Sequence, residues 1–153
     1  MPGGFRLLVG RDLEERERLF GIIANAGQWS LALVIVLDQF PRNMFRDDVR
    51  TYSSDALARE VAGRAIARGV DTRVDGALLE FLYIPFMHSE HLADQQRCVE
   101  LFRNAGNGEN LRYAESHADI IRRFGRFPHR NRILGRITTS EERAFLDSGG
   151  FSG

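Results

Sequence analysis

Lysine is absent from this chain of 153 residues, and all 21 of its basic side chains are arginine. Without lysine, Schiff-base catalysis and the P-loop type of phosphate site are excluded, since both need a lysine amine. Acidic side chains also number 21, so the formal net charge is zero, which argues against a general binder of polyanions. We do not expect nucleic acid as a partner, although Phe124 and Phe127 interleave with arginines as in a stacking platform for single strands.

Cysteine occurs only as Cys98, so no internal disulfide can form. Because Cys98 falls inside a helical pattern, it is expected to be a small core residue rather than a nucleophile. The scarcity of cysteine and the lack of a signal peptide favour a reducing cytoplasm as the location. Long apolar runs are also scarce: polar residues and glycines interrupt 19–37, whose longest apolar run covers Leu31 to Leu37. A buried helix is therefore favoured over a membrane span.

Strand-like alternation of polar and apolar residues is missing, and the whole pattern is helical. With 43% apolar content, the chain is expected to form a single all-α domain over 1–153. Helices are expected at Asp12 to Ala26, Trp29 to Phe40, Asp55 to Arg68, Gly76 to Tyr83, about 90 to Asn104, Glu109 to Phe124 and about 140 to Asp147. The helix from Trp29 is apolar nearly all round, as expected of a central helix.

Several residues next to these helices have the side chains of helix caps. The expected caps are Ser53 or Ser54, Ser89, Gly125 as a left-handed helix end, and Thr139 with Glu142 as a capping box.

Three of the four prolines, Pro41, Pro85 and Pro128, stand 44 and 43 residues apart. Because proline lacks a backbone donor and clashes with the preceding turn, each is expected to end or kink a helix. Each also opens a segment rich in cations, amides or histidine: LDQFPRNMFR (37–46), YIPFMHSEH (83–91) and RFGRFPHRNR (123–132). These three polar segments are expected to form loops on one surface of stacked helical units, where a site would lie.

The three polar segments, read together, resemble the bacterial domain-of-unknown-function family 924. The resemblance rests on LDQFPRNMFR, on YIPFMHSE followed by LADQ, and on RFGRFPHRN followed by LGR and TTSEE, and it covers about Trp29 to Leu146. It implies a tetratricopeptide-like stack of six to seven helices in antiparallel pairs, and it implies no reaction. The chain departs from the family pattern at 1–11, which lacks the family's first helix, and at His91, where an aspartate is usual.

Acidic side chains in the first two segments need partners or ligands. Asp38 ends the apolar run, where desolvation and the helix dipole both disfavour a carboxylate. It is either fixed in a structural ion pair or cap, or it orients a histidine or arginine in a pocket. His88, Glu90, His91 and Asp94 are metal-capable residue types, and Glu90 and Asp94 would share a helical face. Their spacing matches no established metal signature, so no metal is expected.

Six arginines fall within fifteen residues of the third segment and its continuation, with no acid between Asp119 and Glu141. They are Arg122, Arg123, Arg126, Arg130, Arg132 and Arg136. Guanidinium forks match carboxylate and phosphate geometry, so their counter-charges are expected from Asp38, Glu90 and Asp94 or from a ligand. Along the helix itself, the first two arginines can pair with Asp119.

The residues leave two classes of function open. In the first, the loops form a pocket for a small anionic molecule, and proton transfer is available for catalysis. The ligand-binding candidates are Asp38, Arg42, Asn43, Asp94, Arg126, Arg130 and Asn131, and the proton-transfer candidates are His88, Glu90 and His129. In the second, acids and arginines form structural ion pairs, and the chain is a non-catalytic scaffold for a peptide or protein partner. No cofactor is indicated, and His117, on an apolar helix face, is expected to be a core residue.

Overall fold

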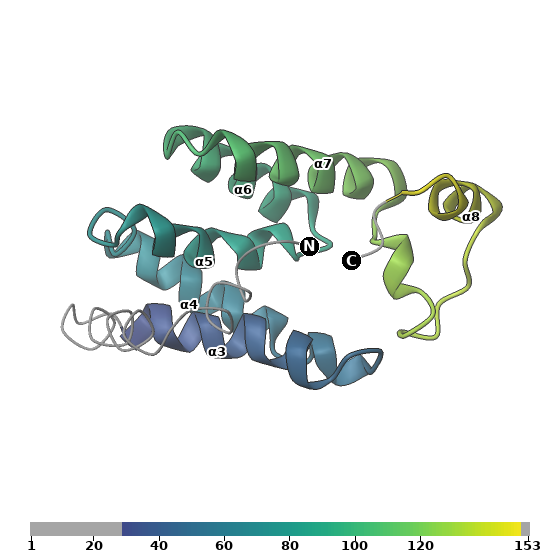
Figure 1. Ribbon diagram of the computed structural model, residues 1–153, viewed down its shortest axis with the longest axis horizontal. Helices are drawn as coiled ribbons and strands as arrows, with labels where there is room; N and C mark the ends of the chain where they lie inside the picture. Colours follow the sequence, from purple (N-terminus) through teal and green to yellow (C-terminus); the bar gives the residue numbers. More distant parts are fainter. Residues whose placement is uncertain (1–28, 151–153) are drawn as a thin grey trace. The chain divides into compact units, whose positions relative to one another are not determined.

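The computed structural model describes residues 29–150, and every regular element within them is a helix (Figure 1). The six α-helices are α3 (Trp29–Met44), α4 (Asp55–Ala67), α5 (Gly76–Met87), α6 (Leu92–Asn104), α7 (Gly108–Phe124) and α8 (Ser140–Asp147), with the 3-10 turns η1 (Val49–Tyr52) and η2 (Pro128–Arg130) between them. The prediction of an all-α fold is confirmed. The helix expected from Asp12 to Ala26 lies outside the described residues, and the tetratricopeptide-like stacking stays a prediction.

The described residues form two compact units, of which the first comprises 29–46 and 50–85. In this unit α3 packs along α4, its neighbour in the sequence (Figure 1). Leu31 and Val34 are fully buried on α3, and Ala58, Ala62 and Ala65 are buried on α4. Alanines at this spacing lie on one side of a helix and let a neighbouring helix approach closely. The helix pair therefore buries apolar surface through closely matched small and large side chains.

The second unit comprises 47–49 and 86–150, and in it α6 and α7 lie side by side (Figure 1). Cys98 and Phe102 on α6 and Ala114 and Ala118 on α7 are buried. Burial raises the pKa of the Cys98 thiol, so the prediction that it is a small core residue is confirmed. Helix α7 ends at Gly125, whose left-handed φ of 69° suits glycine, as predicted. After η2 the chain continues to α8, which contacts that turn.

Each of the three evenly spaced prolines was predicted to end or kink a helix, and two of them lie inside helices and end neither. Helix α3 continues three residues past Pro41 and α5 two residues past Pro85, so neither helix stops at Phe40 or Tyr83 as expected. Only Pro128 begins an element, at the start of η2, where the missing backbone donor costs nothing.

Ser54 explains how α3 tolerates its proline. Pro41 cannot donate to the Leu37 carbonyl four residues back, but the Ser54 hydroxyl donates to that carbonyl at 2.6 Å. Ser54 occupies the N-cap position of α4, as predicted, but its side chain makes no capping hydrogen bond there. The helix itself begins at Asp55 as expected.

The predicted caps of α6 and α8 have different outcomes. Ser89 does not cap α6, because His91 precedes its first residue. The Ser89 hydroxyl instead donates to the Asp94 carboxylate at 2.6 Å and accepts from the His91 N–H at 3.1 Å. The capping box of Thr139 and Glu142 is present at the start of α8, as predicted.

One face of α3 is exposed, which corrects the expectation of a helix buried nearly all round. The exposed apolar side chains are Trp29, Leu33, Val36, Phe40 and Met44, which we call the α3 stripe. Their spacing of three and four residues places them on one side of the helix, away from the side that packs on α4. Within 29–150, no helix is long and apolar enough to cross a membrane.

Candidate functional site

The first polar segment forms an ion-pair cluster within the first unit. The Arg42 guanidinium donates two hydrogen bonds to the Asp55 carboxylate, at 2.8 and 2.9 Å, and lies 3.4 Å from an Asp38 oxygen. Asp38 is 1% exposed and also accepts from the Gln39 amide at 2.5 Å. Burial lowers the pKa of Arg42, but the two acids outweigh this and raise it. Asn43 donates to the Gln39 carbonyl at 2.6 Å, so all of these groups stabilise the end of α3.

Glu90 joins the second and third polar segments within the second unit. Its carboxylate accepts one hydrogen bond from the Phe127 N–H, at 2.7 Å, and two from the Arg136 guanidinium, at 2.7 and 3.0 Å. Burial raises the pKa of Glu90, but these hydrogen bonds outweigh it and lower the pKa. Glu90 precedes α6, so it does not share a helical face with Asp94 as expected. A carboxylate held ionised in this way is a weak base.

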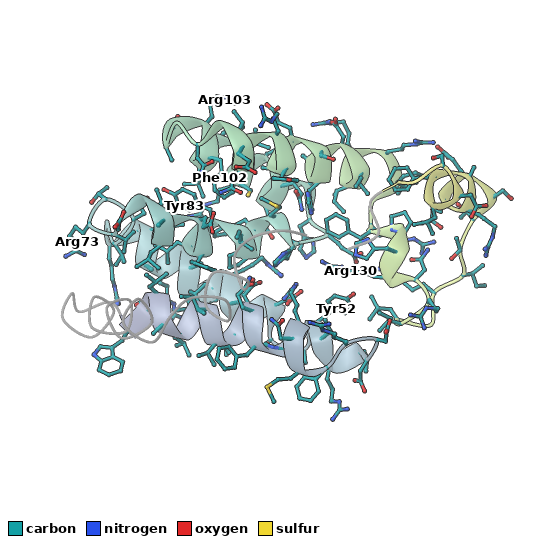
Figure 2. The ribbon with its side chains drawn as sticks, in the orientation of Figure 1. Tyr52, Arg73, Tyr83, Phe102, Arg103 and Arg130 are labelled. Carbon is teal, nitrogen blue, oxygen red and sulfur yellow. The ribbon has the colours of Figure 1, made fainter. Side chains whose placement is uncertain are left out.

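The turn after α5 is fastened by side chains that bond to its backbone. The Gln95 amide, fully buried, donates to the carbonyls of Met87 and Ser89, both at 2.6 Å. Arg130, labelled in Figure 2, donates to the His88 carbonyl at 2.9 Å. The second polar segment is therefore held in place from α6 and from η2.

The arginines of the third polar segment have partners, and five of them pair with carboxylates. The pairs are Arg122 with Asp119, Arg123 with Glu141 at 2.9 Å, Arg126 with Glu142 at 2.6 Å, Arg132 with Asp47 at 2.5 Å, and Arg136 with Glu90 at 2.7 Å. Of these five acids, only Glu90 was predicted as a counter-charge from the earlier segments. Asp119 pairs with Arg122, whereas the sequence predicted pairs with both Arg122 and Arg123. The stretch between Asp119 and Glu141 contains no acid, but α8 folds back toward it. Two glutamates of α8, Glu141 and Glu142, then serve as counter-charges for the arginines.

Glu142 is the most connected acid of the second unit. Its carboxylate accepts from Arg126 at 2.6 and 2.9 Å, from the Asn131 amide at 3.2 Å and from the Thr139 N–H at 2.8 Å. These bonds, that of Arg126 first, lower its pKa to about 2. The Asn131 carbonyl in turn accepts from Arg136 at 2.9 Å. We call Glu90, Arg126, Asn131, Arg136 and Glu142 the ion-pair network.

The Phe127 ring is surrounded by two histidines and an arginine. Its centroid lies 5.6 Å from the rings of both His117 and His129, and the Arg130 guanidinium lies 4.6 Å from it. His117 is 2% exposed and contacts the Tyr113 carbonyl at 2.7 Å, so its predicted core position is confirmed. Burial, together with nearby Arg130, lowers the pKa of both histidines to about 4. Both imidazoles are therefore neutral near pH 7.

The structure brings the second and third polar segments together and describes the first by itself. Glu90 and His88 contact the third segment directly, whereas Asp38, Arg42 and Asn43 belong to the first unit. A single surface shared by all three loops stays a prediction. In the part of the chain that the structure describes, no three His, Cys, Asp or Glu side chains are arranged to hold a metal ion.

A shallow depression of about 570 Å³, absent from the sequence predictions, lies along α7 and α8. Its apolar lining consists of Ile120, Phe124 and Phe145, and its polar lining includes Arg112 and Ser116. The rings of Phe124 and Phe145 lie 5.1 Å apart against a buried apolar cluster. Spacing by four along α7 could have indicated its half of this α7–α8 depression, but no spacing predicts the contribution of α8.

Sequence reasoning also missed Asp55 and Gln95, whose partners lie in a neighbouring segment rather than within one helical turn. Asp55 bonds Arg42, thirteen residues away, and Gln95 bonds Met87, eight residues away. Several of the polar candidates bond to one another or to nearby backbone, while the α7–α8 depression combines an apolar floor with a charged rim.

Comparisons with known proteins agree with the family resemblance. The pattern of the family described as bacterial protein of unknown function (DUF924) matches residues 10–150. A solved structure, that of a protein of unknown function, ATU0120, from Agrobacterium tumefaciens, is similar with 46% sequence identity and a TM-score of 0.77. The similarity covers 95% of this chain and 78% of that one. No curated protein matches the chain.

Proposed function

Because the chain belongs to the DUF924 family of bacterial proteins of unknown function, whose description names no activity, we propose a function from its own side chains. It is a non-catalytic helical domain that binds a segment of a partner protein. One observation carries this proposal: five arginines in or near the polar segments each bond a carboxylate, so they act as structural ion pairs; they are Arg42, Arg123, Arg126, Arg132 and Arg136. The apolar α7–α8 depression then provides the binding surface.

Three arginines that could bind an anion each already donate two hydrogen bonds from the guanidinium to one carboxylate. They are Arg42, Arg126 and Arg136, bonded to Asp55, Glu142 and Glu90 respectively. An incoming phosphate or carboxylate would have to displace a bonded acid and leave that acid unpaired. Breaking a fully buried ion pair costs about 3–5 kcal/mol and breaking a partly exposed one costs less, and a small anion must offset this cost before it binds with any affinity.

Two of the three proton-transfer candidates, Glu90 and His129, have protonation states that disfavour catalysis near neutral pH. Efficient general acids and bases have pKa values near the working pH. Burial lowers the pKa of His129 to about 4, and hydrogen bonds lower that of Glu90. Both groups stay in one protonation state at pH 7, which supports a structural role.

The α7–α8 depression has the composition of a peptide-binding surface. Its floor offers Ile120, Phe124 and Phe145, and its volume of about 570 Å³ accommodates one or two large side chains. Its charged lining consists of Arg112, Glu115, Asp119 and Arg123. The last three pair with Arg103, Arg122 and Glu141, whereas the exposed Arg112 forms no salt bridge among residues 29–150. Charge complementarity therefore favours a partner segment that presents a large apolar or aromatic side chain beside an acidic residue.

Selection from a random peptide display library against the purified full chain tests this function. Enriched peptides are expected to carry an aromatic or large aliphatic residue next to an acid. Ser116→Arg places a long side chain in the depression and should weaken binding at least about tenfold, or about 1.4 kcal/mol. Ser140→Arg is the matched control, because Ser140 is equally exposed but lies outside the depression.

Two results would overturn the proposal. Peptides that bind the Ser116→Arg and Ser140→Arg chains equally would place binding elsewhere. A small anion retained by the purified protein in native mass spectrometry, and lost on Arg130→Lys, would favour the small-molecule function instead.

A further inference from the structure

Three of the groups that line the α7–α8 depression are flat. The rings of Phe124 and Phe145 lie 5.1 Å apart with an interplanar angle of 53°. The Arg123 guanidinium lies 4.6 Å from the centre of the Phe124 ring and 5.8 Å from that of Phe145. A guanidinium is planar and is attracted to the face of an aromatic ring within about 6 Å. Two rings and a guanidinium therefore form one surface of flat groups at the end of α7.

Arg123 is held in place but is not covered. Its Nε donates to the Glu141 carboxylate of α8 at 2.9 Å. The Arg123 side chain nevertheless stays 51% exposed. An incoming group can therefore contact the guanidinium as well as the two rings, without breaking a buried ion pair.

Gly150, which also lines the depression, determines where the Phe145 ring lies. A methyl group at Gly150 would lie 2.7 Å from one atom of this ring and 2.8 Å from another. Non-bonded carbon atoms normally stay about 3.5–4.0 Å apart, so the ring occupies space that any other residue at this position would need. Phe145 can lie against the backbone of the turn because Gly150 has no side chain.

The backbone turn that ends α8 keeps Gly150 in this place. The Gly150 N–H donates to the Phe145 carbonyl at 3.0 Å, and the Gly149 N–H donates to the Leu146 carbonyl at 3.2 Å. Gly149 has a left-handed φ of 80°, and these two bonds form the Schellman motif of helix ends. In that motif the residue at the place of Gly150 often packs an apolar side chain against the helix. Here the Phe145 ring fills that space itself, which fixes it beside Phe124.

We propose that the α7–α8 depression selects an aromatic side chain of the partner segment over an aliphatic side chain of equal size; this inference rests on the proposed function and narrows it. Removal of apolar area from water favours both kinds of side chain, since it depends on the area alone. An aromatic ring also gains contacts with Phe124 and Phe145 and with the Arg123 guanidinium that a saturated side chain does not make. The anchor of the partner is therefore phenylalanine, tyrosine or tryptophan.

Two forms of one peptide test this selectivity on the full chain. A peptide selected by display is synthesised with either phenylalanine or cyclohexylalanine at its anchor position, and calorimetry measures both affinities. The two side chains have nearly the same size and apolar area, but only phenylalanine has a π-system. The phenylalanine peptide should bind about tenfold more tightly, since aromatic pairs and cation–π contacts each contribute a few-fold.

Arg123→Lys separates the flat guanidinium from its charge. Lysine keeps a positive charge beside Glu141 but cannot stack as a planar group. The preference for phenylalanine should fall to about threefold, while the cyclohexylalanine peptide should lose less than about twofold in affinity. Arg122→Lys is the matched control, because Arg122 is the neighbouring residue, is similarly exposed at 58%, and lies outside the depression. The control should leave the preference unchanged.

Gly150→Ala tests whether Gly150 positions the Phe145 ring. The added methyl group displaces the ring, so the preference for phenylalanine should fall at least about threefold. Gly108→Ala on α7 is the control, because a methyl group there meets nothing within 4 Å. Circular dichroism shows whether both variants are folded. An unchanged preference in a folded Gly150→Ala chain would contradict the positioning role.

The outcomes separate this inference from the proposed function. Equal affinities of the two peptides, both weakened by Ser116→Arg, would overturn the aromatic preference and leave peptide binding in place. A library that yields no peptide, or only peptides insensitive to Ser116→Arg, would overturn both. A preference that Arg123→Lys and Arg122→Lys leave equally unchanged would show that the guanidinium takes no part in the selection.

Discussion

Replacing Glu142 by glutamine should destabilise the second unit far more than the same change at the adjacent acid. Glu142 is 2% exposed and accepts hydrogen bonds from Arg126, Asn131 and the Thr139 N–H. Glutamine keeps the size of the side chain but removes the charge, and its NH₂ group cannot accept from Arg126. The guanidinium then loses its counter-charge.

The expected loss follows from two independent quantities. A pKa lowered from 4.5 to about 2 corresponds to about 3 kcal/mol of folding free energy at pH 7. Hydrogen bonds to charged groups contribute about 1.5–3 kcal/mol by mutation. Because Arg126 is partly exposed, with 28% of its side chain accessible, water offsets part of the loss. We expect Glu142→Gln to cost about 2 kcal/mol.

Urea unfolding of the full chain at pH 7 measures this loss, and Glu141→Gln is the control. Glu141 lies next to Glu142 in α8 and pairs with Arg123, but the two side chains are 63% and 51% exposed. Exposed ion pairs contribute between zero and about 1 kcal/mol, so the control should lose less than half as much. Equal losses in the two variants would refute the argument that burial makes Glu142 a structural acid.

The difference between the normal chain and Glu142→Gln should also depend on pH. Because folding lowers the pKa of Glu142, its contribution is complete above the unfolded value of 4.5 and is lost as pH falls toward about 2. Urea midpoints of the two proteins should therefore differ by a constant amount between pH 7 and 5 and converge below that. A difference that is as large at pH 3 as at pH 7 would show that the charge is not responsible.

Three further changes test other parts of the structure by urea unfolding. Ser54→Ala should cost about 1–2 kcal/mol by removing a donor from a carbonyl, and Pro41→Ala in the same chain should recover part of it, whereas additive losses would contradict this bond. Burial lowers the pKa of His117 to about 4, so its contribution is complete above about pH 6.5 and is lost toward pH 4. His117→Phe should reduce the loss of stability between pH 7 and 5, and an unchanged loss would contradict that role. Arg42→Ala, which removes the guanidinium shared by Asp38 and Asp55, should cost about 3–5 kcal/mol, whereas Arg64→Ala at an exposed pair should cost less than about 1, so similar losses would be inconsistent with burial.

Local signals in the sequence predicted most helices because the residues that decide them are neighbours. Thr139 and Glu142 form their capping box within four residues, and Gly125 ends α7 through its own backbone preference. The predicted ends of α3 and α5 were wrong because the residues that decide them are not neighbours in the sequence. Pro41 cannot bond the Leu37 carbonyl, which instead accepts a hydrogen bond from Ser54. Ser54 lies outside α3, so rules based on neighbouring residues could not predict this donor.

The sequence predicted which kinds of residue interact at the candidate site, but not which residue pairs with which. The need of Asp38 for a partner followed from its apolar surroundings, and Arg42 meets it within one helical turn. The partner of Arg126 could not be predicted, since α8 must fold back before Glu142 can reach it. Ion pairs between distant segments depend on tertiary structure, which spacing along the chain does not encode.

The position of α8 at the end of the described chain affects the order in which the protein can complete its fold during synthesis. Arg126 and Asn131 leave the ribosome before Glu142, so the Arg126 guanidinium lacks its counter-charge and the Asn131 amide lacks its bond to Glu142 until α8 follows. A product that stops before α8 would lack both bonds, and it would populate open states that proteases recognise. The ion pairs of the second unit therefore form completely only when the chain includes the glutamates of α8, and truncated products are expected to be degraded.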